Sequence, residues 1–203
     1  MNISRLLLLL ISLSWLGCTP GHAADDAPPQ ITRIDIPAQI ISEASALVRS
    51  HRNPEILWTL NDSGSGPDIY ALSTNGGLLG SATLTGPGII NQDWEDMASF
   101  TREQKHFLLI GDVGDNYAWR PNITLYLIEQ PVWPAPADTA TAPVLHTFRV
   151  ELPNGPRDIE AIAVDPDENA AYLISKRDNR PTLYRFSLAH AETPATSSVP
   201  STT

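Results

Sequence analysis

Short runs of apolar residues, many of them alternating with polar residues, follow one another along most of the chain. Examples are ILWTL at 56–60, HFLLI at 106–110 and AAYLI at 170–174. Gly, Pro, Asn and Asp separate these runs, which are rich in Ile, Leu, Val, Tyr and Thr. Alternation with period two between turn residues is typical of β-strands, whereas a helix shows apolar residues at a period near 3.6. The pattern predicts an all-β domain.

The same order of runs occurs three times, in segments of about 50–65 residues. The segments are 42–86, 94–153 and 159–188, and the third stops after its third run. Four strands per repeat of this length predict the blades of a β-propeller, with antiparallel strands in each blade. Three columns of residues recur when the segments are aligned: Glu43, Glu95 and Glu160; Ala46, Ala98 and Ala163; Tyr70, Tyr126 and Tyr184.

About three blades are visible, whereas propellers close with about four to eight. We therefore expect an incomplete ring, in a chain that is a shortened version of a longer protein. The run QITRIDI at 30–36 is predicted as a strand that would close a ring by pairing with a last blade. A complete three-blade protein, the alternative, would leave open sheet edges that favour self-association. The Ala column is expected to lie on the innermost strands, where blades crowd toward the axis.

The first residues are predicted to be a signal peptide. Arg5 precedes the apolar run Leu6–Leu13, which is too short to span a bilayer comfortably, and Gly21 and Ala23 supply small residues for cleavage before Ala24. We therefore expect a signal peptide at 1–23, the propeller domain at 24–188 and a disordered tail at 189–203, which is rich in Ala, Ser, Thr and Pro.

The single cysteine, Cys18, lies within this leader. A lipoprotein signal with cleavage before Cys18 and acylation of its thiol is the alternative to plain cleavage, although Trp15 and Leu16 fit the usual lipobox poorly. Export leads to a periplasmic or secreted protein, or to a lipid-anchored envelope protein. In either case the domain is expected to contain no disulfide.

The formal net charge of −10 excludes some partners. Non-specific binding to nucleic acid or to anionic lipid requires a basic face, so neither is expected, and contact with a membrane is expected only through lipidation at Cys18. Cations and neutral or basic ligands fit this charge. The sequence contains no dinucleotide, P-loop, HExxH or GxSxG motif.

The topology of a blade predicts where polar residues gather. In an antiparallel meander, the start of the first strand and the end of the second lie at the same edge of the sheet. The Glu column and the ends of the second strands are therefore expected to face one mouth of the propeller. The acidic, amide and lysine candidates there are Glu43, Asp62, Asp93, Glu95, Asp96, Asp112, Asp115, Asn116, Asp158, Glu160 and Lys176, and Arg120, Arg157, Arg177 and Arg180 lie on loops of the same face.

Two interpretations of these residues remain open. Oxygen ligands without His or Cys suit a hard cation, above all Ca²⁺, and GDVGDN at 111–116 combines flexible turns with close oxygens. The alternative is that Asp and Asn cap backbone amides in turns and that the repeated Glu joins neighbouring blades.

Among the aromatic residues, Trp119 is the better candidate for contact with a ligand, because Trp58 and Trp94 fall on strand positions and are predicted to be core. The residues that we predict to contact a ligand at the mouth are Asp62, Asp96, Asp115, Asn116, Trp119, Arg120 and Lys176.

Several motifs resemble a group of exported bacterial β-propeller proteins with no assigned activity, and are distantly similar to the NHL, phytase-like and lactonase-like propellers. These motifs are DWEDMA at 93–98, GDVGDN at 111–116 with Arg120, YLIEQP at 126–131, DIEAIAVDP at 158–166 and YLISK at 172–176. In the calcium-dependent hydrolases of these groups, carboxylates at the mouth of the channel bind Ca²⁺. The resemblance therefore implies Ca²⁺ ligands at Glu43, Glu95, Asp112 and Glu160.

Three functions are compatible with the sequence. The leading hypothesis is an exported binding module that holds a small molecule, a glycan or a protein loop at its polar mouth. The main alternative is a Ca²⁺-dependent hydrolase of phosphate esters or lactones. A purely structural envelope protein is the third, and fold analogy does not decide between them.

Overall fold

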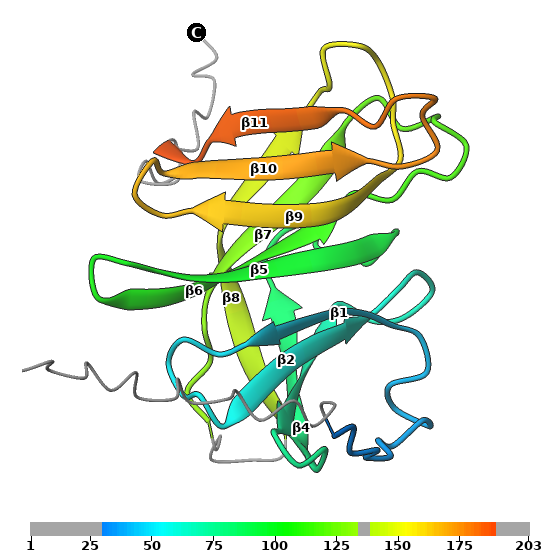
Figure 1. Cartoon of the computed structure of the whole chain (residues 1–203). Helices are drawn as coiled ribbons and strands as arrows, with labels where there is room; N and C mark the ends of the chain where they lie inside the picture. The colour runs from blue at the N-terminus through cyan, green and yellow to red at the C-terminus, as the bar shows by residue number, and fades with distance from the viewer. Residues whose placement is uncertain (1–29, 134–138, 190–203) are drawn as a thin grey trace, which may run out of the picture. The chain divides into compact units, whose positions relative to one another are not determined.

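The computed structural model describes residues 30–133 and 139–189. Within these ranges the chain forms strands and no α-helix, which agrees with the all-β prediction (Figure 1). The predicted signal peptide with Cys18, and the predicted tail from residue 190 onward, lie outside the described residues. The described part holds no helix of the length and apolarity needed to cross a membrane. The strands are β1 (Ala44–Arg49), β2 (Ile56–Asn61), β3 (Asp68–Ser73), β4 (Leu78–Thr85), β5 (Trp94–Arg102), β6 (Lys105–Asp112), β7 (Ile123–Glu129), β8 (Thr139–Val150), β9 (Ile159–Asp165), β10 (Ala170–Ser175) and β11 (Leu183–Ser187).

These strands form antiparallel blades in chain order. β1 to β4 pair successively, β5 to β8 do the same, and β9 to β11 make a three-stranded sheet. The first strands of the blades lie side by side, β5 between β1 and β9 (Figure 1). Consecutive four-stranded meanders whose first strands face one another are the arrangement of a β-propeller, so the predicted fold class is confirmed.

The outer strands of the first two blades are joined in a way that the sequence did not indicate. β8 begins at Thr139, and its first part pairs in parallel with β4, from Ser81 with Thr139 to Thr85 with Pro143. From Val144 onward β8 pairs with β7. The two blades therefore share one eight-stranded sheet. Proline has no N–H to donate, and Pro143 stands where β8 passes from one partner strand to the other.

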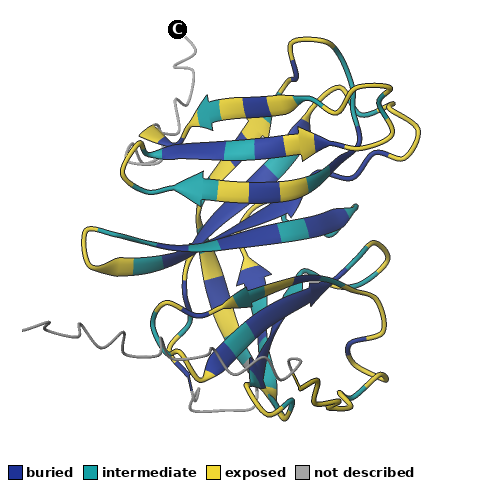
Figure 2. Ribbon diagram, in the orientation of Figure 1, coloured by how far each residue is buried: buried dark blue, intermediate teal, exposed yellow. Residues whose placement is uncertain are grey.

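Both faces of the second blade are buried. Leu108 and Ile110 of β6 pack with Trp58 of the first blade, whereas Leu109 packs with Ile162 and the third blade. Because successive side chains of a strand point to opposite faces, a strand between two cores is apolar throughout. This explains the unbroken run at 107–110. In Figure 2 β5 is buried along most of its length, whereas β9 alternates between buried and exposed residues.

The recurring columns behave differently. Tyr70, Tyr126 and Tyr184 are all buried, each pairing with the second strand of its blade. Trp58 and Trp94 are fully buried, as predicted. All three members of the Ala column lie on the first strands of their blades, as predicted, but they differ in register and in burial.

Ala46 directly follows the bulge of its strand, two positions before the place that Ala98 and Ala163 occupy in theirs. Ala46 and Ala98 are buried, but Ala163 is exposed on β9. The run QITRIDI at 30–36, predicted as a strand that would pair with a last blade, adopts no strand in this structure. An extended segment becomes a strand only when a neighbouring strand satisfies its backbone groups, and none of the strand pairings among the described residues includes 30–36.

Candidate functional site

Polar residues gather at the edge of the blades where the first strands begin and the second strands end. The backbone joins these two points in the same way in each blade. Asp62 N donates to Glu43 O at 2.9 Å, Val113 N to Asp93 O at 3.1 Å, and Lys176 N to Asp158 O at 2.8 Å. The residue just after the second strand is thus held against the residue just before the first.

A β-bulge follows in each first strand. Ala44 and Ala46, Trp94 and Asp96, and Ile159 and Ala161 pair with adjacent residues of the second strands. The residues between them, Ser45, Glu95 and Glu160, are the extra residues of the bulges. A bulge redirects a side chain and is common beside functional sites.

The predicted Glu column therefore needs a correction in the first blade. The counterpart of Glu95 and Glu160 is Ser45, and Glu43 instead matches Asp93 and Asp158. Ser45 remains part of the site, because its Oγ donates to Glu95 O at 2.8 Å and to Glu95 Oε2 at 3.2 Å.

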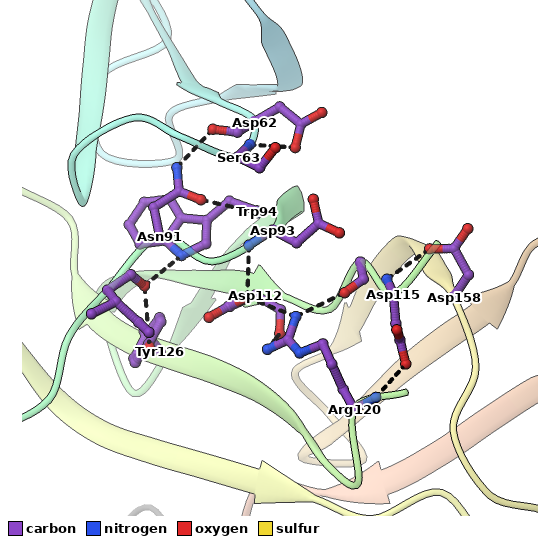
Figure 3. Close-up of polar contacts among 12 residues, drawn as sticks. Asp62, Ser63, Asn91, Asp93, Trp94, Asp112, Asp115, Arg120, Tyr126 and Asp158 are labelled. Carbon is purple, nitrogen blue, oxygen red and sulfur yellow. Dashed lines mark hydrogen bonds and ion pairs between the residues drawn. The ribbon is translucent and has the colours of Figure 1, made fainter. Parts of the chain in front are cut away.

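Two groups of carboxylates share Glu95. Asp62, Asp93 and Glu95 form one, and Glu95, Asp158 and Glu160 form the other, with ligand oxygens in each group within 4.8 Å of one another. Figure 3 shows Asp62 and Asp93 at the ends of neighbouring blades, with Asp158 beyond Asp115. We call the first group the Glu95 triad.

The chain's own basic groups neutralise the second group. Lys176 Nζ lies 2.7 Å from Glu160 Oε1, and Arg177 Nε lies 2.7 Å from Asp158 Oδ2. Within the described ranges, Asp62, Asp93 and Glu95 form no ion pair with a basic residue. No ion pair among the described residues therefore neutralises the Glu95 triad, although the charge of Arg120 offsets part of the rise in the pKa of Asp93.

The protonation of this triad reflects that excess charge. Burial, followed by the neighbouring Glu160, Asp62 and Asp93, raises the pKa of Glu95 to about 7. Burial and Asp62 likewise raise the pKa of Asp93 to about 6. Carboxylates that cannot all be charged together either keep a proton or bind a cation.

Asp112, predicted as a metal ligand, is not part of either group. Its carboxylate Oδ1 lies 2.9 Å from Arg120 Nη1 and accepts a hydrogen bond from Asp93 N at 3.1 Å. Arg120 also donates to the backbone oxygens of Gly114 and Asp112. The guanidinium of Arg120 is thus bound by groups of the protein itself (Figure 3).

Of the four implied Ca²⁺ ligands, the structure brings together only Glu95 and Glu160. Glu43 is exposed and lies outside both groups, because it occupies the position of Asp93 and Asp158 and not that of Glu95. Asp112 is oriented toward a guanidinium and a backbone amide.

Two residues predicted to contact a ligand, Asp115 in a loop and Asp96 in β5, accept hydrogen bonds from backbone amides instead. Asp115 is buried and accepts hydrogen bonds from Trp119 N at 2.9 Å and Arg120 N at 2.8 Å. Asp96 accepts from Met97 N and from Ile162 N. These contacts follow the amide-capping alternative of the sequence analysis.

The remaining predicted contacts lie at the surface of the same region. Asn116 accepts from Arg177, Lys176 pairs with Glu160, and Trp119 is 77% exposed. Trp119 stacks on Tyr117, with ring centroids 4.7 Å apart.

Sequence reasoning placed Asp93 and Asp158 at the mouth but not among the ligands, and it passed over Ser45 and Tyr117. The acidic residue two positions before Glu95 and Glu160 is the signal that could have revealed the first pair. An aromatic residue two positions from Trp119, across a loop, could have revealed Tyr117.

Comparisons with known proteins identify no family. No family model and no curated protein sequence match the chain. Among solved structures, the β-propeller domain of Cps50 (Swd1) from Myceliophteria thermophila is similar with a TM-score of 0.44 and 13% identity, over 72% of this chain and 38% of that one. Hsv2p of Kluyveromyces lactis is similar with a TM-score of 0.35 and 15% identity, over 71% of this chain and 48% of that one. The chain thus spans less than half the length of these two structures.

Proposed function

We propose that the chain is an exported β-propeller binding module, which holds its ligand at the polar end of the blades and binds Ca²⁺ there through Asp62, Asp93 and Glu95. One observation carries this proposal. Three carboxylates on two neighbouring blades have ligand oxygens within 4.8 Å of one another, and no basic side chain of the described residues pairs with them.

The chemistry of these groups supports Ca²⁺ over other ions. Every side-chain ligand is a carboxylate oxygen, which a hard cation prefers. Oxygens that share one Ca²⁺ lie at most about 5 Å apart, since each is about 2.3–2.6 Å from the ion. Binding of the cation also relieves the repulsion that raises the pKa values of Asp93 and Glu95.

The location and partners of the module form part of the proposal. The leader at 1–23 supports export to the periplasm or the medium, and acylation at Cys18 would instead anchor the protein in the envelope. Mass spectrometry of the mature N-terminus separates these cases. A small molecule, a glycan or a loop of a protein is the ligand class that this end can take.

Calorimetric titration of the full chain with Ca²⁺ tests the cation site. We expect saturable binding that Glu95→Gln reduces at least tenfold, since this change removes charge and preserves shape. Glu151→Gln is the matched control, because Glu151 is an exposed carboxylate outside the site. The proposal fails if Ca²⁺ gives no heat, or if both variants bind it equally well.

A second candidate is the Ca²⁺-dependent hydrolase of phosphate esters or lactones. The grouping of carboxylate oxygens favours it, because a cation held there could polarise a phosphoryl or carbonyl oxygen of a substrate. Esterase and phosphatase activity in the presence of Ca²⁺, lost with a chelator and in Glu95→Gln, would support it. Ca²⁺ binding without hydrolysis of any ester, lactone or phosphate ester tested would contradict the hydrolase and favour the binding module.

A further inference from the structure

A pocket of about 500 Å³ opens beside the Glu95 triad. Its lining includes Tyr117, Trp119, Asp93, Asn116 and Arg120. The volume lies within the range of small-molecule sites, which combine aromatic walls with a few polar groups. Asp93 belongs both to this pocket and to the triad.

The aromatic wall is held in place by its loop. The Asp115 carboxylate accepts the backbone N–H groups of Trp119 and Arg120, and Ala118 N donates to Asp115 O at 2.8 Å. Ala118 adopts a φ of 52°, in the left-handed region that non-glycine residues rarely enter. Asp115 is itself held by its N–H, which donates to Asp158 Oδ1 at 2.9 Å.

These contacts hold Tyr117 and Trp119 in the solvent, 73% and 77% exposed, although both are large and apolar. A strained backbone and exposed aromatic surface are both unfavourable for the folded state. Each feature is common at ligand-binding sites, and this loop has both.

The charges that face the pocket favour one class of ligand. Arg120 is only 12% exposed and its guanidinium is bound to Asp112 and two backbone oxygens, so its positive charge is already compensated. Both oxygens of Asp115 accept hydrogen bonds from the loop. Asp93 is the lining carboxylate that has no basic partner among the described residues. An aromatic face beside a carboxylate of this kind attracts a cation.

We propose that this pocket binds an alkylammonium group, with its methyl or methylene groups against the outside of the stacked Tyr117–Trp119 pair and its charge toward Asp93. The inference deepens the proposed binding module by naming a ligand class for the same end of the blades. A free quaternary amine and a lysine side chain of a partner protein share this chemistry. Because both cations use Asp93, Ca²⁺ at the triad should weaken binding of the amine.

Calorimetric titration of the full chain with choline, in the presence of a chelator, provides the test. The matched control ligand is 3,3-dimethyl-1-butanol, which has the same shape without the charge. We expect choline to bind at least tenfold more tightly than the alcohol. Trp119→Ala and Asp93→Asn should each weaken choline about tenfold, and Trp119→Phe should bind nearly as the wild type does. Leu183→Ala, an exposed apolar change on β11, should have no effect.

Three results would overturn the inference. They are equal affinities for choline and the alcohol, unchanged binding by Trp119→Ala, and no choline binding up to about 10 mM. Saturable binding of a neutral oligosaccharide that depends on Trp119, with no binding of choline, would assign the pocket to a glycan instead. A short lysine-containing peptide is titrated in parallel. If the peptide binds at least as tightly as choline, the natural ligand is a lysine side chain of a partner protein.

Titration with Ca²⁺ alone on the same samples keeps the two proposals apart. Ca²⁺ binding without choline binding would contradict only the proposal of an alkylammonium ligand. Choline binding without Ca²⁺ binding would contradict only the proposal of a metal site. Absence of both contradicts the binding module at this end of the blades.

Discussion

The carboxylate of Asp96, in the first strand of the second blade, accepts a 2.7 Å hydrogen bond from the backbone N–H of Ile162, in the first strand of the third blade. The same side chain accepts from Met97 N at 2.8 Å. β5 and β9 lie side by side without pairing as a ladder, so Asp96 provides a direct polar link between the first strands of two blades whose shared core is apolar. A second link joins Arg102 Nη1 to Asn169 Oδ1 at 2.6 Å.

Replacing Asp96 by Ala is therefore expected to destabilise the fold by about 1–3 kcal/mol, because the partly buried N–H of Ile162 loses its acceptor. Asp96→Asn keeps one acceptor oxygen and should cost less. Urea denaturation gives the free energies of unfolding. Asp167→Ala, an exposed change, is the control and should stay within about 0.5 kcal/mol of the wild type. A cost for Asp96→Ala as small as that of the control would contradict the link.

The ion pair of Arg120 with Asp112 should contribute far more than a surface pair. Only 12% of the Arg120 side chain and 2% of the Asp112 side chain are exposed. Arg120→Ala leaves the buried Asp112 carboxylate without its charged partner, with the backbone N–H of Asp93 still donating to it, and should cost about 3–5 kcal/mol. Arg185→Ala removes an exposed pair with Glu168 and should cost at most about 1 kcal/mol. Similar losses in the two variants, measured by urea denaturation, would refute this assignment.

The sequence predicted the blades well because alternation and turn residues mark strands locally. It predicted the Tyr column correctly, since Tyr70, Tyr126 and Tyr184 occupy equivalent positions. It placed Glu43 two residues out of register. A shift of two keeps every side chain on the same face of a strand, so the hydrophobic pattern could not reveal the error.

The rest of the site depends on contacts between blades. Ser45 is not identifiable as a partner of Glu95 from a single sequence. The bulges that bring the two residues together each add one residue to a strand, and no pattern of residue types marks them. The parallel pairing of β4 with β8 likewise joins segments far apart in the chain.

Ala98 and Ala163 offer a matched pair for packing at equivalent positions. Ala98 pairs with Leu109 and is buried between the second and third blades, whereas Ala163 pairs with Tyr172 and is exposed. Ala98→Leu should overpack the core and cost roughly 1–3 kcal/mol. Ala163→Leu should change the free energy of unfolding by less than about 0.5 kcal/mol. A larger loss of unfolding free energy for Ala163→Leu than for Ala98→Leu, measured by thermal or urea unfolding, would contradict the burial of Ala98 and the exposure of Ala163.

Without Ca²⁺, the stability of the fold should fall as pH rises from about 5 to about 8. The folded protein keeps a proton on Glu95 up to a pKa of about 7, above its ordinary 4.5, and on Asp93 up to about 6, above its ordinary 3.8. The folded state thus binds more protons than the unfolded chain in this window, and its stabilisation is lost as those protons leave. The loss should be of order 1–3 kcal/mol. Glu95→Gln should flatten the profile, and an unchanged slope in that variant would count against Glu95 as its source.

A thermal melt separates the cation site from a mere contact between blades. If the Glu95 triad binds Ca²⁺, the wild-type melting temperature should rise with Ca²⁺ and fall back with a chelator. In Glu95→Gln both changes in melting temperature should be much smaller at the same Ca²⁺ concentration. A wild type insensitive to the chelator, together with an unstable Glu95→Gln, would leave Glu95 as a contact between blades only.

Proton release on Ca²⁺ binding tests the central claim most directly. With pKa values raised to about 7 for Glu95 and about 6 for Asp93, these carboxyls are partly protonated near neutral pH, so a cation at the triad must displace protons. Calorimetric titration at about pH 6.5 in two buffers of different ionisation enthalpy measures that release, and a titration at about pH 8.5 provides the deprotonated reference. We predict tighter Ca²⁺ binding and little proton release at the higher pH, and release of a substantial fraction of a proton at the lower pH, reduced in Glu95→Gln. Binding with no proton release at either pH, or no binding at all, would contradict a Ca²⁺ site at Asp62, Asp93 and Glu95.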